Sequence, residues 1–504
     1  MQRRYLLKAM AAVGAGLSLP HANVFGQTAV SNTINVKHLF NQAIQKDDAL
    51  IGLADVQQNY TEQSLKIDGK LPKDIHGYFY RNGPAKHERG EQRYQHLFEG
   101  DGMLQRFAIG EGKIKHIGKF VNTPKYAHEE SAKRFMFDGP DTKLTVSSAV
   151  AHADTINTAN TNIIPVGDDL WALWEGGSAS VIDKASLSFK NFANLGENSQ
   201  YGDKLKRLPF SAHPKIEANG DIWNFGYNAA GTIVLYHLSA QGKTKNVGLI
   251  NTDFRAGMLH DFLITHKHIL LILPSITKDA SAHGMFTSIR FNKHQPMKVM
   301  VLDKNTLKLA RQYELPPGFA FHFGNAWEEA DGSIYFDASL YSDVKILHEM
   351  SHIMQGKHIA KPATSNTCLY HLKANGSVDY QRLKENSEFP RVSNYLTGLK
   401  NRYLYHVGNT HDGLWSDSIY RVDWHNDTVE SYDYGKEYIV EEHIPIAQDN
   451  NENNGYLIGT ALHVPSKRTC LNIFNVAKLS DGPITRAWLP YHLPLGFHGN
   501  YSAA

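Results

Sequence analysis

From Gly77 onward the chain is a succession of short apolar runs that are separated by turn residues. The runs are rich in Val, Ile, Leu, Tyr, Phe and Trp, and examples are DIWNFGY, HILLILP, SIYFDAS and GYLIGTALH. Such runs, bounded by Gly, Asn, Asp or Pro, are typical of β-strands that are joined by tight turns. Because no helical segments alternate with them, the pattern favours a large all-β fold. A β-propeller is the natural candidate, since its radial blades bring distant segments to one axis.

Turn dipeptides support this interpretation. Asn-Gly pairs begin at residues 219, 375 and 454, and Asp-Gly pairs begin at residues 68, 101, 138, 331, 412 and 481. Both pairs favour tight hairpin turns. The chain has no clean repeat of blade length, so the number of blades does not follow from the pattern alone. Residues 341–365 lack the strand pattern, and we expect a helical or loop-like insertion there.

The N-terminus resembles an export signal. Residues 3–8, RRYLLK, precede an apolar run of small residues from Ala9 to Leu19 that is too short to span a bilayer. The paired arginines predict a twin-arginine signal over residues 1–27, with cleavage between Ala22 and Val30. A general secretory signal and an uncleaved anchor are the alternatives. We therefore expect a periplasmic or otherwise exported protein.

The remainder is expected to form one domain behind a short leader. Residues 28–70 are polar and weakly patterned, which predicts an N-terminal arm or cap. Residues 71–504 are expected to form a single β-propeller domain. The two cysteines, Cys368 and Cys470, would allow one disulfide in an oxidising compartment but cannot supply a thiolate metal site.

Charge and hydropathy exclude some partners. The 504 residues include 52 Lys and Arg against 50 Asp and Glu, a net charge of +2, so we expect no nucleic-acid partner. No internal stretch reaches the roughly 18 to 20 apolar residues that cross a bilayer. Peripheral membrane contact for the uptake of a hydrophobic substrate stays compatible with this composition, and no oligomeric state follows from it.

Four histidines lie in similarly built local contexts, which are SAHPK at His213, MLHDF at His260, FHFGNAWEE at His322 and GFHGNY at His498. Neutral imidazoles in dry surroundings are good ligands for iron, copper or zinc. The four lie too far apart in the chain for one loop to supply them. They would have to converge from several structural units, which again favours a closed, roughly circular fold. Ordinary half-buried histidines are the alternative, because the chain has 27 of them.

A second histidine pattern lies in the predicted insertion. The segment from His348 to His352 reads HEMSH and matches HExxH, the motif in which two histidines bind zinc and the glutamate activates water in metalloproteases. His358 stands where the longer protease motif has its third ligand, but the required glycine is displaced by one position, to Gly356. An exposed helix is therefore the preferred interpretation, and a zinc protease is kept as an alternative.

Ten strings, in the same order, connect the chain with a known family. They are GYFYRNGP (77–84), HLFEGDGMLQRF (96–107), NTANTN (157–162), LWALWEGG (170–177), AHPK (212–215), LHDFLIT (259–265), FHFGNAWEE (321–329), EFPRV (388–392), EEHI (441–444) and GFHGNY (496–501). On these strings the chain resembles the carotenoid cleavage oxygenases, which include apocarotenoid oxygenases, lignostilbene dioxygenases and retinoid isomerohydrolases. The resemblance covers about Leu71 to Tyr501.

The resemblance implies a seven-bladed β-propeller with a helical or loop dome over an axial metal site. One Fe(II) per chain would be bound by His213, His260, His322 and His498. Three glutamates would support these ligands, namely Glu175 beside His260, Glu388 beside His322 and Glu442 beside His498. Carboxylates that accept the distal N–H of an imidazole orient the ring and supply negative charge near the metal. Glu441 is the competing match for Glu442, and an exposed ion pair is the alternative for each glutamate.

The resemblance also implies an activity. Members of the family cleave a carbon–carbon double bond with O2 to give aldehydes or ketones, and the hydrophobic alkene and O2 would be the partners of this chain. No flavin or nicotinamide motif is visible, and none is needed for that reaction. Trp174, Phe321 and Trp327 flank the metal motifs and are candidates to line a substrate tunnel, with core packing as the alternative.

The substrate class is expected to be a carotenoid or an apocarotenoid. Lignostilbene-type members use a tyrosine and a lysine to bind a phenolate, and Lys125 in NTPKY lies near where that lysine would fall. Gln95 occupies the tyrosine position, however, and Tyr94 precedes it. A phenolic stilbene or phenylpropenoid is therefore the alternative substrate. A metal-free propeller that acts as a binding module is the alternative from another class of function.

Overall fold

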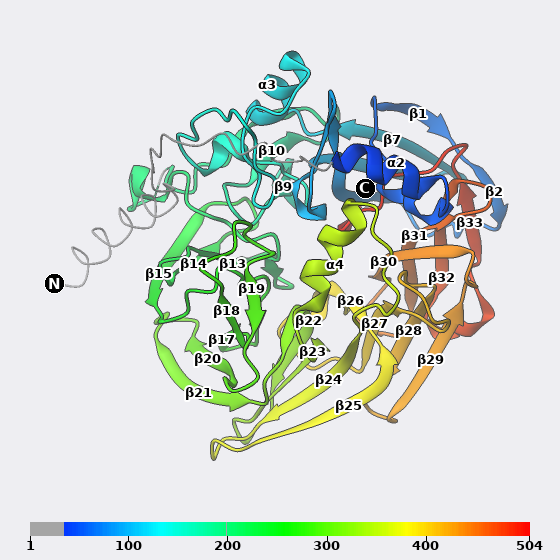
Figure 1. Ribbon diagram of the computed structural model, residues 1–504. Coiled ribbons are helices and arrows are strands. Elements are labelled where there is room, and N and C mark those ends of the chain that lie inside the picture. The colour runs from blue at the N-terminus through cyan, green and yellow to red at the C-terminus, as the bar shows by residue number, and fades with distance from the viewer. Residues whose placement is uncertain (1–34, 198) are drawn as a thin grey trace.

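The computed structural model describes residues 35–197 and 199–504. Within these ranges the strands form seven antiparallel sheets of four or five strands, arranged around a common axis (Figure 1). The chain is thus a seven-bladed β-propeller, which confirms the expected fold class. The predicted signal over residues 1–27 lies outside the described residues.

Five blades are built from strands in chain order, with the first strand of each innermost. Their members are, for blade 1, β8 (Asn162–Val166), β9 (Asp169–Leu173), β10 (Ser180–Asp183) and β11 (Phe189–Phe192); for blade 2, β12 (Lys215–Ile216), β13 (Ile222–Tyr227), β14 (Thr232–Leu238) and β15 (Thr244–Asn251); for blade 3, β16 (Leu263–Ile264), β17 (His268–Leu273), β20 (Met297–Asp303) and β21 (Leu309–Leu315); for blade 4, β22 (Phe319–Glu328), β23 (Ile334–Tyr341), β24 (Ser365–Leu372) and β25 (Val378–Asn386); and for blade 5, β26 (Glu388–Arg391), β27 (Tyr403–Gly408), β28 (Ser418–Asp423) and β29 (Thr428–Asp433).

Two blades combine both ends of the described chain and close the ring. From the axis outward, blade 6 contains β30 (Tyr438–Ala447), β31 (Gly455–His463), β32 (Arg468–Asn475), β33 (Thr485–Trp488) and β2 (Lys66–Gly69), and blade 7 contains β34 (His498–Ala503), β3 (Gly77–Lys86), β6 (Asp101–Gly110), β7 (Lys113–Phe120) and β1 (Tyr60–Ser64). Part of the segment assigned from sequence to an N-terminal arm or cap, residues 28–70, therefore supplies the outer strands of these blades. Closure depends on β34, which pairs with β3 in the register Asn82 to His498.

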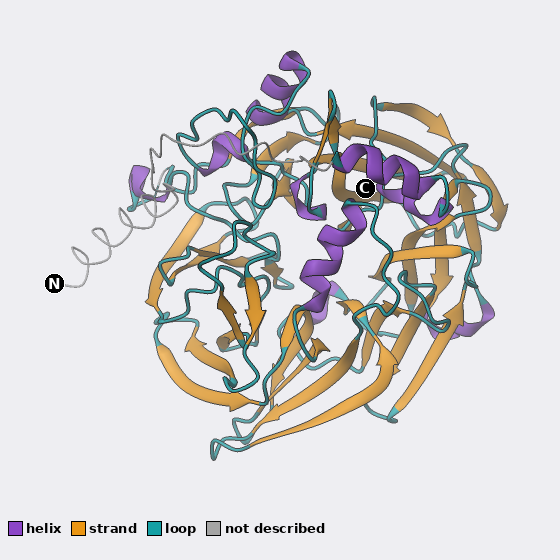
Figure 2. Cartoon of the chain, viewed as in Figure 1, coloured by secondary structure: helices purple, strands orange, loops and turns teal. Residues whose placement is uncertain are grey.

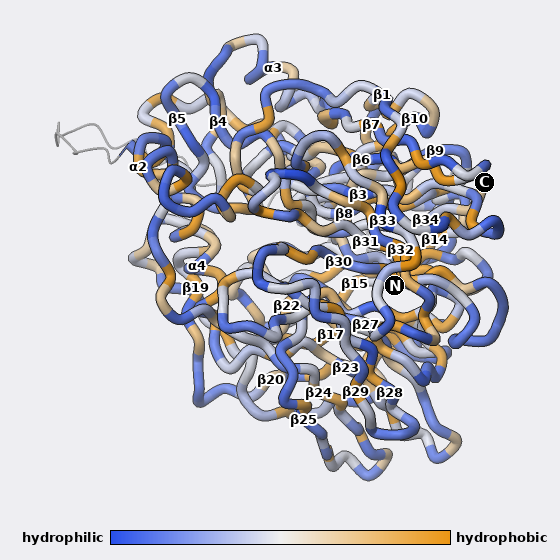
Figure 3. Tube along the Cα trace, turned by 90° about the vertical axis from the view of Figure 1, so that its right-hand side faces the viewer, coloured by the Kyte–Doolittle hydropathy of each residue, from blue (hydrophilic) through white to orange (hydrophobic). Residues whose placement is uncertain are grey.

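Helices and short hairpins cover one end of the propeller (Figures 1 and 2). The helices are α2 (Val36–Ile44), α3 (Pro124–Ala132) and α4 (Lys345–Met354). The hairpins are β4 (Glu88–Arg89) with β5 (Gln92–Arg93), and β18 (Ile276–Lys278) with β19 (Ile289–Phe291). The described residues also form 3-10 turns at various places in the fold, which are η1 (Asp48–Leu53), η2 (Leu97–Glu99), η3 (Ala153–Ile156), η4 (Gly202–Leu205), η5 (Asn394–Leu396) and η6 (Val476–Asp481). Turned by 90°, α2 and α4 lie on one side of the blades (Figure 3). Helix α4 lies inside the predicted insertion, residues 341–365.

The dome over the axis is held by a small apolar cluster. Phe40 of α2 and Leu53 of η1 pack with Ile353 and Met354 of α4 and with Leu495 from the segment before β34. Burial of such side chains is the main driving force for docking a short amphipathic helix. None of the described helices is long and apolar enough to cross a membrane.

Both cysteines are free and buried, so the disulfide that the sequence would allow does not form. Cys368 lies in β24 of blade 4, and Cys470 lies in β32 of blade 6. Burial raises the pKa of each thiol to about 11. The cysteines therefore act as small apolar side chains of the core.

A buried carboxyl group shapes β22, the innermost strand of blade 4. The pairing of β22 with β23 is irregular between Ala320 and Ala326, and Asp337 of β23 accepts the N–H groups of Gly324 and Asn325 at 2.9 and 3.2 Å there. Burial raises the pKa of Asp337 to about 7, although the two N–H donors oppose the change. Asp337 thus fixes the irregular part of the strand that follows His322.

This pKa predicts a pH dependence of stability. Between about pH 4 and pH 7 the folded protein keeps the Asp337 proton and the unfolded chain does not, so stability should fall by about 4 kcal/mol as pH rises through this range. The Asn side chain of the Asp337→Asn variant cannot ionise, so the variant should lack this pH-dependent fall in stability. Urea unfolding at pH 5 and pH 8 measures the difference in the free energy of unfolding between the variant and the parent. The titration of all other groups affects both proteins alike and cancels in this difference. Exposed Asp253→Asn is the control. A difference that is equal at both pH values would contradict the prediction.

Candidate metal centre

The structure brings together the four histidines that the sequence singled out. His213 lies two residues before the innermost strand β12, and His260 lies three residues before β16. His322 lies in β22, and His498 begins β34. All four are buried, and their potential ligand atoms lie within 4.8 Å of one another. They come from blades 2, 3, 4 and 7, so the closed ring brings them together at its axis.

Their geometry fits a transition-metal ion. Nε2 of His213 and Nε2 of His260 are 2.9 Å apart, and adjacent ligands on an octahedral ion with bonds of about 2.1 Å are separated by roughly 3 Å. Nε2 of His322 is buried and has no hydrogen-bond partner among the described residues. Buried polar atoms without a partner are costly, and a bound cation would satisfy this nitrogen. The donor set of four imidazoles suits iron, copper, nickel or zinc.

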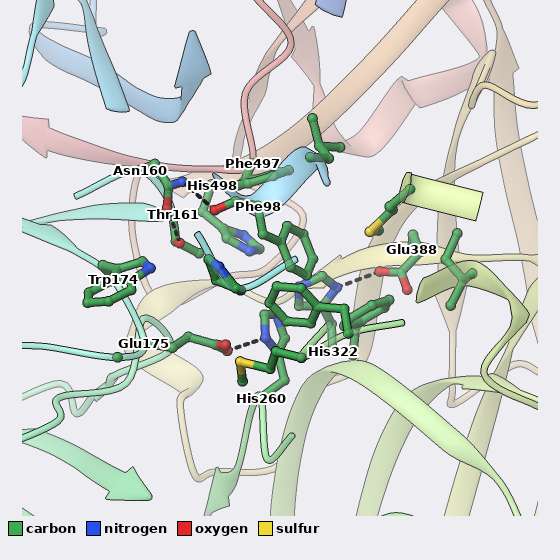
Figure 4. Close-up of a pocket in the computed structure, with 18 of the residues that line it drawn as sticks. Phe98, Asn160, Thr161, Trp174, Glu175, His260, His322, Glu388, Phe497 and His498 are labelled. Carbon is green, nitrogen blue, oxygen red and sulfur yellow. Dashed lines mark hydrogen bonds and ion pairs between the residues drawn. The ribbon is translucent and has the colours of Figure 1, made fainter. Parts of the chain in front are cut away.

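Three glutamates support the rings from behind. Glu388 Oε2 accepts from Nδ1 of His322 at 2.5 Å, and Glu442 Oε1 accepts from Nδ1 of His498 at 2.9 Å. Glu175 makes the corresponding contact with Nδ1 of His260. Figure 4 shows the contacts of Glu175 and Glu388 with their histidines. These are the pairs that the family resemblance implied.

Glu441 is occupied elsewhere, which resolves its competition with Glu442. Its Oε1 lies 3.0 Å from Nη2 of Arg81 and accepts the N–H of Gly496 at 2.7 Å. Its other oxygen accepts from the hydroxyl of Thr460. Side chains on neighbouring residues of β30 thus have different partners, and Glu442 is the one that reaches His498.

Electrostatics favour a cation at the centre of the histidines. Burial and the three neighbouring imidazoles hold the pKa of His213 well below its usual value. Burial lowers the pKa of His498 to about 4 although Glu442 opposes it. Glu442 is buried too, yet Arg391 and His498 lower its pKa to about 2. His260 differs, because the nearby Glu175 raises its pKa against the effect of burial. The site therefore places the neutral imidazoles of His213 and His498 near the ionised carboxylate of Glu442.

The four histidines and three glutamates are shared evenly around the ring. Blade 1 supplies Glu175, in the turn after β9, and blades 5 and 6 supply the glutamates of β26 and β30. Blades 2, 3, 4 and 7 supply one histidine each. Every blade thus contributes one residue to the candidate centre.

A cavity of about 630 Å³ lies between the histidines and the dome. Phe98 and Phe321, whose rings meet edge to face, lie above His260, and Phe497 packs against Phe98 in the same way (Figure 4). Helix α4 adds Ile346, Met350 and Ile353 to the wall. We call this space the upper cavity; His260, His322 and His498 form part of its lining.

The aromatic candidates divide into two groups. Trp174 and Phe321 line the upper cavity as predicted. The prediction for Trp327 was wrong, because its ring stacks on Tyr335 at 5.4 Å and its Nε1 donates to Glu329, away from the cavity. The pairing of β22 with β23 is irregular twice before Ala326, so the side that Trp327 faces does not follow from simple alternation along the strand.

Sequence reasoning missed several residues of the cavity wall. Phe98, Asn160 and Thr161 line it, and they belong to the strings HLFEGDGM and NTANTN, to which no role was assigned. Those strings were the available signal. The contributions of α4 had no such signal, because an apolar helix face looks the same whether it covers a core or a cavity.

The HExxH segment does not form a metal site. Nε2 of His348 contacts the carbonyl oxygen of Ile289 at 3.1 Å, and His352 is exposed. Glu349 is buried and accepts the N–H of Ala363 while pairing with Lys345 at 2.9 Å. Helix α4 therefore uses its glutamate to hold the following loop, and the zinc protease alternative loses its support.

The predicted phenolate-binding lysine is engaged in a buried ion cluster. Nζ of Lys125 lies 2.7 Å from Asp101, 3.0 Å from Glu129 and 2.8 Å from the hydroxyl of Tyr94. Neither Lys125, Tyr94 nor Gln95 belongs to the lining of the upper cavity. The lysine is thus neutralised within the protein and does not face the candidate centre.

Comparisons with known proteins identify the family and the fold. The family model described as retinal pigment epithelial membrane protein matches residues 53–503. Apocarotenoid-15,15'-oxygenase of Synechocystis sp. is 25% identical over 485 residues, covering 90% of this chain and 96% of that protein. Lignostilbene-alpha,beta-dioxygenase isozyme III of Sphingomonas paucimobilis is 26% identical, covering 87% and 94%. The structure of cobalt-substituted Synechocystis apocarotenoid oxygenase superimposes with a TM-score of 0.80 at 23% identity, covering 91% and 98%.

The two histidine patterns make opposite predictions for metal binding. His498→Ala should abolish stoichiometric binding of Co²⁺ or Fe²⁺, because it removes one of four converging nitrogens. Glu388→Gln should weaken binding roughly 10- to 100-fold, as expected for loss of a carboxylate that orients a ligand. His352→Ala is the matched control and should bind like the parent. Titration followed by Co²⁺ absorbance measures all three, and normal binding by His498→Ala would contradict the assignment.

Proposed function

The chain belongs to the family described as retinal pigment epithelial membrane protein, and on that premise we propose that it is an Fe(II)-dependent dioxygenase that cleaves a carbon–carbon double bond of a carotenoid or apocarotenoid. The products would be aldehydes or ketones. The observation that carries this proposal is the cluster of four buried histidines, three of which are supported by carboxylates and form the floor of a largely apolar cavity. One Fe(II) per chain would be held by His213, His260, His322 and His498. When bound, it supplies the redox-active centre at which O2 reacts with the alkene.

The protein's own contribution is to position the alkene and to exclude water. Phe98 and Phe497 lie beside the histidines (Figure 4), and Phe321 meets Phe98 edge to face in the lining of the same cavity. A flat conjugated chain would therefore lie between aromatic edges. Holding one double bond beside the reacting centre replaces a chance encounter by a fixed geometry. Both oxygen atoms of O2 enter the two carbonyl products, so the reaction balances without a reductant or a proton donor.

The glutamates act through the histidines. Glu175, Glu388 and Glu442 would fix the orientation of three imidazoles and offset part of the positive charge of the ion. Glu175 and Glu388 also line the upper cavity, but each has an oxygen engaged with the Nδ1 atom of its histidine, and the double-bond cleavage needs no acid or base. We regard them as positioning residues of the reaction.

Substrate class follows from the wall of the upper cavity. A polyene needs a long apolar space, and Leu259, Met350, Leu414, Val440 and Leu495 extend the apolar wall beyond the aromatic residues. A phenolic stilbene needs a polar partner for its hydroxyl group, and Lys125 is engaged by Asp101 and Glu129 instead. These contacts support a carotenoid or an apocarotenoid over the lignostilbene-type alternative.

We also propose that the protein acts after export. Arg3 and Arg4 precede a short apolar run, and this twin-arginine pattern is the basis for a periplasmic location. A carotenoid is dissolved in membranes, so peripheral contact with a bilayer would give the upper cavity access to its substrate.

Product analysis under ¹⁸O2 tests the activity. The Fe²⁺-reconstituted protein should convert a carotene or an apocarotenal into two carbonyl products that each contain one ¹⁸O atom, and rapid reduction to alcohols prevents exchange with water. Hydroxystilbenes should react more slowly or not at all. Mass spectrometry measures both results.

Two variants separate this activity from contamination and from the protease alternative. His498→Ala should be inactive, and His352→Ala should retain full activity. Absence of cleaved products from every alkene would overturn the proposed function, and preferential cleavage of stilbenes would transfer it to the lignostilbene type.

A further inference from the structure

The four histidines separate two cavities. Opposite the upper cavity lies a second space of about 380 Å³, which we call the axial channel. His322 and His498 line both spaces, whereas His260 lines only the upper cavity and His213 lines only the axial channel. The candidate centre can therefore be approached from two sides.

The axial channel runs along the propeller axis. The innermost strand of every blade contributes to its wall; six of these residues are Asn162, Lys215, Ile264, Asn325, Arg391 and Asn500. The seventh strand, β30, contributes Glu442. At the far end the exposed residues Ala218 and Asn394 also belong to the wall, so the channel reaches the surface away from the dome.

The walls of the two spaces differ in chemistry. Both walls contain polar groups, but the wall of the upper cavity is mostly apolar, whereas polar atoms make up a much larger share of the wall of the axial channel. A hydrated divalent cation loses much favourable solvation in an apolar passage. Oxygen atoms of amides and carboxylates can replace its water ligands one at a time.

Three carboxylates, those of Glu217, Asp261 and Glu442, line the channel, and each is paired with a cationic side chain. Asp261 is buried beside His260, and its Oδ1 pairs with Nζ of Lys215 at 2.9 Å. Glu442 lies behind His498. Glu217 lies on the same wall, where Lys304 pairs with it at 2.7 Å. A cation that enters here approaches carboxylates before and after it reaches the imidazoles.

His213 is the ligand that faces this side. It is the one histidine of the four with no carboxylate partner among residues 35–197 and 199–504. The other three rings are each held from behind by a glutamate. The orientation of the His213 ring is therefore the least restrained of the four. His213 is also the one histidine of the four that lines the axial channel without lining the upper cavity.

We propose that the axial channel is the route by which the hydrated metal ion reaches and leaves the four histidines, while the upper cavity serves the organic substrate. The inference rests on the metal-binding part of the proposed function and goes beyond it. His213 is the first ligand of the incoming ion, and the three carboxylate-held histidines complete the site. The metal and the substrate then exchange through opposite faces of the same centre.

Site-directed labelling of the metal-free protein tests the route. Ala218→Cys/Asn394→Cys places two thiols at the solvent end of the axial channel, and Lys278→Cys/Met285→Cys places two at the rim of the upper cavity. Native Cys368 and Cys470 are fully buried, so a bulky maleimide should modify only the introduced thiols of the folded protein. The Co²⁺ exchange rates of each double variant are compared before and after labelling, so any effect of the substitutions themselves on folding is common to both measurements.

Stopped-flow absorbance then follows the binding and release of Co²⁺. Labelling the axial-channel pair should slow association and dissociation together by about tenfold or more, and leave the dissociation constant unchanged, because a blocked path changes rates and not the equilibrium. Labelling the upper pair should change both rates less than about twofold.

Other outcomes would overturn the route. They are slower exchange only when the upper pair is labelled, equal effects of both labels, or no effect of either. A weaker equilibrium affinity with an unchanged association rate would show damage to the site in place of a blocked path. Failure of the unlabelled parent to bind Co²⁺ would overturn the metal centre and the proposed function with it, which is distinguishable from failure of the route alone.

Discussion

Closure of the ring is the constraint on which the rest of the structure depends. The four histidines come from four blades and meet only at the axis, so no single blade supplies more than one of them. The backbone pairing of β3 with β34 joins the two ends of the ring and places His498 opposite Asn82. Metal geometry, the dome and the two cavities all follow from that pairing.

The charge arrangement explains why each blade contributes one residue. Four neutral imidazoles leave the charge of a divalent ion uncompensated, and water cannot compensate it in a buried site. Glutamates from blades 1, 5 and 6 supply this charge without occupying ligand positions, because each contacts the far nitrogen of a ring. Arg391, 3.8 Å from Glu442, limits the excess of negative charge on that side.

Much of this could be predicted from sequence because the relevant residues lie in short ordered strings. The strand-length runs predicted a large all-β fold with a propeller as the candidate, and the local contexts of the four histidines suggested ligands. The seven blades and the three glutamates followed from the family resemblance that the ten strings carry. The HExxH match suggested a zinc site because a local motif does not show which groups its side chains contact in the fold. In the structure Glu349 accepts the N–H of Ala363 and so fixes the loop after α4. Trp327 in β22 and Lys125 in α3 show the same limit, since tertiary contacts that the sequence does not display decide whether either side chain faces the cavity. The part of the cavity wall that α4 supplies could not be predicted, because it depends on how the helix packs over the propeller, and no sequence motif specifies that packing.

The interleaving of blades 6 and 7 also has a consequence for the order of events during synthesis. Strands β1, β2 and β3 leave the ribosome early, but their blades stay incomplete until β30 to β34 have been made. Because β34 is the last strand of the ring and begins with His498, the four-histidine site cannot exist on a nascent chain that still lacks this strand. A metal ion could therefore be bound only after this strand has been made, and until then the early strands have exposed edges that call for protection from aggregation.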